Sequence, residues 1–140
     1  MKKLYILFLI VICSTVSFAQ DKKVRTTFEA GEIMAMKETM LFDDDYTQSD
    51  KPYQVNIVGI ATGNTDPKKK QDLCQKQGLA VVKVSIENGT IKKGDLITSS
   101  SKKGTGMKAT QSGMVIGIAQ EDANADGQIK VQILLQYVKQ

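Results

Sequence analysis

The sequence predicts a mainly β protein, a small β-barrel or sandwich of five to seven strands that follows a signal peptide and a short N-terminal helix. From Tyr53 onward, apolar residues alternate at the period of two that is typical of strands. Turns containing glycine separate these runs at short intervals, as in small all-β domains. Before Tyr53 the apolar spacing is instead helical.

The first residues have the layout of a secretory signal peptide. Lys2 and Lys3 precede an uncharged apolar run, Leu4 to Cys13, and Ser17-Phe18-Ala19 places small residues where a signal peptidase needs them. Cleavage before Gln20 removes residues 1–19 and leaves 121 residues, one domain by length. The apolar run is shorter than the about 20 residues that span a bilayer. We therefore expect a secreted, periplasmic or cell-surface protein with no stable membrane insertion after cleavage.

Residues 20–52 are expected to form a helical segment and a linker. Ile33, Met36, Met40 and Leu41 fall on one helical face, which predicts a helix over residues 29–42. The acidic stretch that follows and Pro52 predict a loop over residues 43–53.

Residues 53–140 are expected to form the barrel-like domain. Strands are predicted in residues 53–63 and 80–87, on either side of an exposed excursion rich in lysine. Asn88-Gly89 is a strong hairpin signal, and Thr90 and Ile91 would begin the returning strand. Gly94-Asp95 predicts a second tight corner before a strand at residues 96–100. Further strands are predicted at residues 107–109, 114–120 and 128–138.

The segment between the last two predicted strands contains part of a calcium-loop motif. Asp122, Asn124, Asp126 and Gly127 occupy positions 1, 3, 5 and 6 of such a loop. Position 12 should be a bidentate glutamate, but it falls on Ile133 in an apolar strand. These residues are therefore candidates for a calcium site, but a polar hairpin turn whose side chains cap the backbone is the favoured interpretation.

The residue types needed for most catalytic centres are missing. The chain has no histidine, which excludes Ser-His-Asp and Cys-His centres and zinc sites built on imidazole. The remaining nucleophilic option pairs Ser99, Ser100 or Ser101 with Lys102 or Lys103. Adjacent residues rarely present both groups to one substrate, so we expect no enzyme activity, no catalytic residues and no organic cofactor.

The charge and the cysteine content indicate which ligands and which disulfide bonds can be expected. The formal net charge is +4, and loss of the two leader lysines lowers it to +2, which gives no reason to expect nucleic acid binding. Lys102, Lys103 and Lys108 in a glycine-rich loop are candidates for a weak anion or glycan contact. Cys74 would be the single cysteine after cleavage, so no internal disulfide is expected.

Several motifs in the C-terminal half of the sequence resemble those of a known protein family. A strand with V-x-V is followed by Gly94-Asp95-Leu96-Ile97-Thr98, a glycine loop before M-K-A, and Gly117-Ile118-Ala119 with an acidic residue shortly after. This layout resembles the small C-terminal β-domain of phage tail and appendage proteins and of bacterial surface proteins, some of the intramolecular-chaperone type, over about residues 55–138. The resemblance implies a barrel-like fold and a role in assembly or display, often in trimers.

Together these features predict a non-enzymatic exported structural or interaction module that acts in assembly or display on the cell envelope. Its partner would be another envelope or extracellular protein, or the protein itself as a homo-oligomer such as a trimer. The alternatives are a ligand-binding module, with calcium at residues 122–127 or glycan on the lysine-rich loops, and a serine-lysine self-processing hydrolase.

Overall fold

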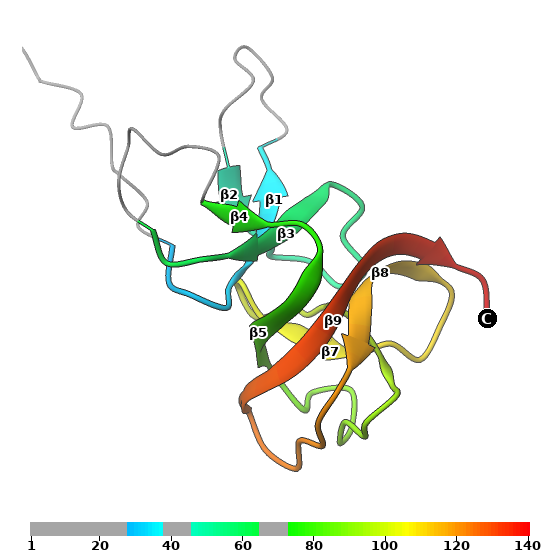
Figure 1. Ribbon diagram of the computed structural model, residues 1–140. Coiled ribbons are helices and arrows are strands. Elements are labelled where there is room, and N and C mark those ends of the chain that lie inside the picture. Colours follow the sequence, from blue (N-terminus) through cyan, green and yellow to red (C-terminus); the bar gives the residue numbers. More distant parts are fainter. Residues whose placement is uncertain (1–27, 38–45, 65–72) are drawn as a thin grey trace, which may run out of the picture.

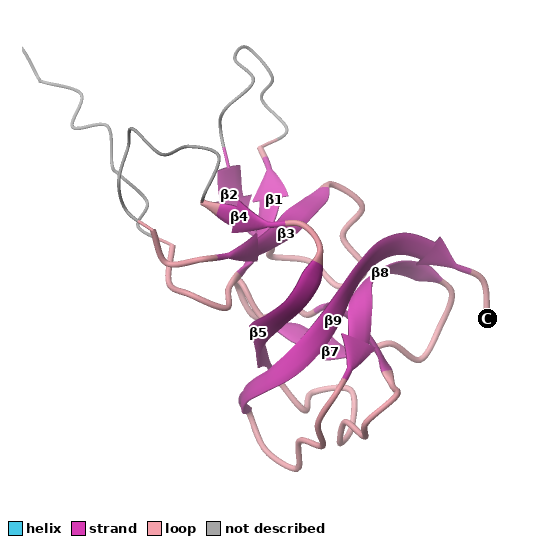
Figure 2. Cartoon of the chain, in the orientation of Figure 1, coloured by secondary structure: helices cyan, strands magenta, loops and turns pink. Residues whose placement is uncertain are grey.

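A computed structural model of the chain describes residues 28–37, 46–64 and 73–140 (Figure 1). These residues form an all-β structure of nine strands and contain no helix (Figure 2). They accordingly include no helix that could cross a membrane. The strands are divided between a four-stranded sheet and a closed five-stranded barrel.

The sheet contains the first four strands in the order β2-β1-β3-β4, all antiparallel. Its strands are β1 (Ile33–Met36), β2 (Tyr46–Gln48), β3 (Ile57–Ala61) and β4 (Cys74–Gln75). The helix predicted over residues 29–42 is wrong where the structure describes it, because Ile33–Met36 form strand β1. The rest of that prediction, residues 38–42, lies outside the described residues. Ile33, Met34 and Ala35 are all fully buried, so both faces of β1 are covered and no alternation marks it as a strand.

The barrel contains the last five strands in the closed order β5-β7-β6-β8-β9. They are β5 (Gly78–Val84), β6 (Leu96–Ser99), β7 (Gly106–Lys108), β8 (Gly113–Ala119) and β9 (Gly127–Val138). Pairing is antiparallel except between β5 and β7, which run parallel. The predicted strands of the C-terminal half are therefore confirmed, and the segment before β9 is the hairpin connection from β8.

The barrel interior follows from the alternation along its strands. Ala80, Val82 and Val84 of β5 are buried, and so are Ile129, Val131 and Ile133 of β9. Val131 pairs with Ala80, and Ile129 pairs with Val82. Burying each such aliphatic side chain contributes roughly 1.5–3 kcal/mol of transfer free energy, which makes this interior the main stabilising feature of the barrel.

The Asn88-Gly89 turn forms, but it does not make the predicted hairpin. The N–H of Gly89 donates to the carbonyl of Ile86 at 2.9 Å, as in a tight turn. Ile91 then bridges to Ala123 in the β8–β9 connection instead of pairing with β5. The edge of β5 that such a hairpin would have used is shared between β7 and the segment before β1. The second predicted corner is confirmed, because the N–H of Asp95 donates to the carbonyl of Lys92 at 2.9 Å.

Hydrogen bonds join the sheet to the barrel. The N–H of Ile33 donates to Gly104 at 2.9 Å, and the N–H of Lys83 donates to Gly31 at 2.9 Å. Lys83 also forms an ion pair with the buried Glu32 at 3.3 Å. The four-stranded sheet thus contains strands from both sides of the boundary expected between residues 52 and 53, and it packs on the barrel.

The Tyr53 side chain ties the loop before β3 to the barrel. Its hydroxyl accepts hydrogen bonds from the N–H groups of Thr110 and Gln111 at 2.8 and 3.2 Å. Its ring lies against Gly113, where an added Cβ would come within 2.5 Å of a ring carbon. Tyr53 has a positive φ of 54°, a conformation that costs free energy and that these contacts hold in place.

Candidate functional site

In the structure, the two carboxylates of the calcium-like turn bind different partners. Asp122 accepts hydrogen bonds from the N–H of Lys93 at 2.8 Å and from the Lys92 ammonium at 3.3 Å. Asp126 accepts one from the N–H of Ile86 at 2.9 Å and pairs with the Lys102 ammonium. Asn124 is exposed between them. The backbone hydrogen bond from Lys93 lowers the pKa of Asp122, and the Lys102 ammonium lowers the pKa of Asp126.

These contacts are those of a turn whose side chains bind neighbouring loops. Within residues 28–37, 46–64 and 73–140, no group of three or more histidine, cysteine or acidic side chains is arranged to hold a metal ion. The carboxylates of Asp122 and Asp126 accept hydrogen bonds from the backbone of two other loops, at Lys93 and at Ile86.

The serines of the predicted serine-lysine pairs use their hydroxyls elsewhere. The buried Ser99 hydroxyl donates to the carbonyl of Lys51 at 2.7 Å and accepts from the N–H of Gln54 at 2.8 Å. Ser100 is buried and bonds the backbone of Lys102, and the Ser101 hydroxyl donates to the carboxylate of Glu87 at 2.5 Å. None of these hydroxyl contacts involves a lysine amine.

Two lysines of the same loop, Lys102 and Lys108, bind carboxylates. The Asp126 carboxylate raises the pKa of Lys102, which therefore stays protonated near neutral pH. Lys108 pairs with Asp95 at 3.0 Å, while Lys103 is exposed. Lys102 and Lys108 thus bind two different carboxylates.

Cys74 lies in a protected position in β4. The thiol is half-buried, and this burial raises its pKa above the usual range. It packs against Gly59, where an added Cβ would lie 2.5 Å from the sulfur. A neutral, packed thiol is a poor nucleophile, because the thiolate is the reactive form.

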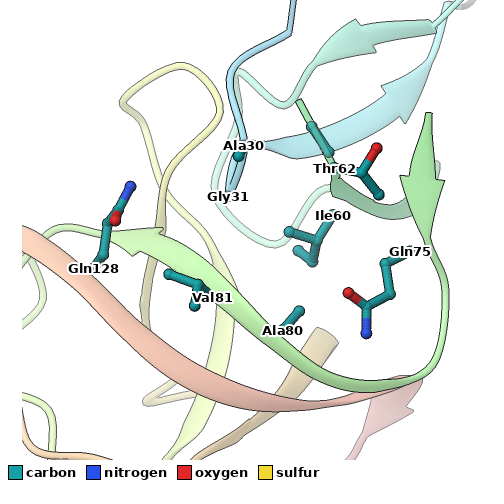
Figure 3. A pocket seen from close by; sticks show the side chains of 9 residues that line it. Ala30, Gly31, Ile60, Thr62, Gln75, Ala80, Val81 and Gln128 are labelled. Carbon is teal, nitrogen blue, oxygen red and sulfur yellow. The ribbon is translucent and has the colours of Figure 1, made fainter. Parts of the chain in front are cut away.

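A pocket of about 420 Å³ lies where the sheet meets the barrel (Figure 3). We call it the junction pocket. Its small or aliphatic lining residues are Ala30, Gly31, Ile60, Ala61, Ala80 and Val81. Figure 3 shows Ile60 of β3 and Ala80 of β5 on opposite sides of this space, with Gln75 closing one end. The polar lining consists of Thr62, Gln75 and Gln128.

The lining of the junction pocket contains no charged side chain and no serine, cysteine or histidine. Among these lining residues, none could act as a general base to activate the Thr62 hydroxyl. What it offers is apolar contact and neutral hydrogen bonding, which are features of binding sites.

Exposed apolar side chains lie beside the pocket on the outer face of the barrel. Leu79 and Val81 of β5 are 53% and 48% exposed, and Leu134 of β9 is 42% exposed. Leu79 pairs with Gln132, so Leu134 is a diagonal neighbour on the same face. We call these three residues the exposed apolar face. Val81 belongs both to this face and to the pocket lining.

The sequence did not indicate the pocket, because its lining comes from five separate segments and contains no motif. The exposed apolar face did leave a signal, since β5 is apolar at Leu79 and Val81 as well as at Ala80 and Val82. Comparison with protein-family models, with curated proteins and with solved structures found no match for this chain.

Proposed function

We propose that the chain is a non-enzymatic exported interaction module, acting in assembly or display on the cell envelope, and that it binds through the exposed apolar face and the junction pocket. One observation carries this proposal: the uncharged pocket adjoins the solvent-exposed side chains of Leu79, Val81 and Leu134. Contiguous exposed apolar side chains on a small domain mark binding surfaces. The partner is another envelope or extracellular protein, or a further copy of the chain.

Two further observations support binding over catalysis. The candidate base Lys102 has a raised pKa and binds Asp126, so it would have to lose both its proton and its partner to activate a serine. The resemblance to C-terminal β-domains of phage appendages and bacterial surface proteins also implies assembly, and the apparent leader implies export.

Association of the mature chain tests the proposal. We expect residues 20–140 to sediment as a larger species at rising concentration, or to form a complex with a second envelope protein. Leu79→Glu combined with Leu134→Glu should abolish that association, because each substitution places a charge that would have to be desolvated.

Val55→Glu is the matched control. Val55 is 77% exposed. It lies before the start of β3, whereas the pocket residue Ala61 lies at the end of that strand. The double variant and the control should both fold, since all three sites are exposed. A chain that stays monomeric and unpartnered, or a double variant that associates like the control, would contradict the proposal.

A further inference from the structure

We propose that the edge of β5 at Val81 accepts an extended, uncharged peptide segment of a partner protein by strand addition, with one partner side chain in the junction pocket. This inference rests on the proposed function and specifies its binding site and the kind of partner. It follows from the hydrogen bonds along one edge of β5.

The N–H groups of β5 that point away from β9 can be followed in order. The N–H of Ser85, just after the strand, donates to Gly106 at 2.7 Å, and the N–H of Lys83 donates to Gly31 at 2.9 Å. The β5–β9 register continues without a shift from Val84 to Gly78. In an antiparallel ladder every second residue directs its N–H to the same side. The N–H of Val81 therefore points to the same side as that of Lys83.

Val81 differs from Lys83 and Ser85 in how its N–H is bonded. On one side of it Gly31 is bonded to Lys83, and on the other the Gln75 side-chain amide donates to the carbonyl of Leu79 at 2.9 Å. Among the described residues, none supplies an acceptor for the N–H of Val81. The junction pocket opens at this position, between Gly31 and Gln75.

An unpaired N–H on the edge of a strand can donate to a carbonyl of another extended chain, which then pairs with the strand at that position. The small side chains of Ala30, Ala61 and Ala80 leave room in the pocket for a side chain of the incoming segment. The neutral lining selects an uncharged side chain, since a charge would be buried there without a counter-ion. Side chains alternating to the other face would meet Leu79 and Val81.

The test uses residues 20–140 and the blocked peptide acetyl-Thr-Val-Thr-Val-Thr-amide, which is extended in preference and carries no charge. Val81→Pro removes the N–H, and this position tolerates proline because its N–H does not bond to β9. Val81→Thr is the matched control, because it keeps the N–H and a β-branched shape. Both substitutions change the side chain, so the comparison between them isolates the N–H. We expect Val81→Pro to bind the peptide about 2- to 12-fold more weakly than Val81→Thr, the loss of one hydrogen bond.

Amide hydrogen exchange gives a readout that does not depend on the folding of the proline variant. In the free protein the Val81 amide should exchange faster than that of Val82, which faces β9, and the peptide should slow it selectively. Unchanged exchange at Val81, or equal binding by the proline and threonine variants, overturns strand addition. Protection of Val81 that increases with protein concentration without peptide would make a second copy the occupant and overturn the assignment to a partner peptide.

Failure of this inference can be distinguished from failure of the proposed function. If the peptide does not bind but Leu79→Glu with Leu134→Glu still abolishes association, strand addition is wrong and the interaction module stands. If association is also insensitive to those substitutions, both proposals are wrong.

Discussion

At the scale of single residues, two buried serines near the sheet–barrel contact differ in how their hydroxyls are satisfied. The Ser49 hydroxyl is fully buried and has no hydrogen-bond partner among the described residues. The Ser99 hydroxyl has two, the carbonyl of Lys51 and the N–H of Gln54. Burial of an unpaired hydroxyl costs free energy, whereas a paired one contributes to stability.

Ser49→Ala should therefore stabilise the fold by about 1 kcal/mol, and Ser99→Ala should destabilise it by about 1–2 kcal/mol. The urea midpoints of the two variants, compared with wild type, measure both effects. A loss of stability in Ser49→Ala similar to that in Ser99→Ala would contradict the hydrogen-bond assignment.

Gly117 in β8 is required by close backbone contact. A Cβ at this position would lie 2.1 Å from the carbonyl oxygen of Gln132 in β9, a backbone atom that cannot rotate away. At Gly127, in contrast, no atom lies within 4 Å of an added Cβ. Gly117→Ala should lower the free energy of unfolding by about 3 kcal/mol or more, through strain in the barrel wall.

Gly127→Ala is the control and should change the free energy of unfolding by less than about 0.5 kcal/mol. Chemical denaturation of both variants distinguishes a local steric requirement from a general preference for glycine in strands. Similar losses in the two variants would show that the β8–β9 contact at Gly117 is less close than described.

At the scale of elements, the β8–β9 connection is stabilised by carboxylates with lowered pKa values. Asp126 has an ordinary pKa of 3.8, which the Lys102 ammonium and the N–H of Ile86 lower in the folded chain. Its contribution is complete above the unfolded-state value and is lost as the pH falls through the lower folded-state value. Stability should therefore fall with acidification below about pH 4, the usual range of an aspartate.

Asp126→Asn should reduce this acid sensitivity, because the amide oxygen can still accept from Ile86 but carries no titrating charge. The urea midpoint measured as a function of pH for wild type and variant tests this. Parallel pH profiles down to the acid limit would show that Asp126 does not contribute to the transition.

The elements that the sequence predicted well are those that are half-buried. In β5 and β9, interior residues such as Val82 and Val131 alternate with partly or largely exposed neighbours, so the period of two is visible. Strand β1 was missed because Ile33 to Ala35 are buried on both faces, and their spacing matched a helix. Long-range pairings such as β5 with β7, which is parallel, have no local signal in the sequence.

The candidate site was harder to predict because it, too, depends on long-range contacts that leave no local signal in the sequence. The junction pocket depends on how the sheet packs on the barrel and on which backbone edge of β5 remains open. Neither property belongs to a side chain. The calcium-like motif was visible in the sequence, yet its carboxylates are arranged by the lysines and loops around them, which only the tertiary structure brings together.

At the scale of the whole molecule, the sequence of residues 1–19 predicts a cleaved leader and export of the protein. We expect the exported protein to begin at Gln20, because Ser17-Phe18-Ala19 fits the cleavage site. N-terminal sequencing or intact mass of the protein recovered outside the cytoplasm measures this directly. A chain that retains residues 1–19 would contradict the prediction and favour a membrane anchor.

The central claim is that the surface around β5 binds a partner at the envelope. Site-specific photo-cross-linking in the native envelope tests it most directly, with a benzophenone amino acid at position 79 and, as the control, at position 55. A discrete cross-linked product is expected from position 79 and none from position 55. No product from position 79, or the same products from both positions, would contradict it.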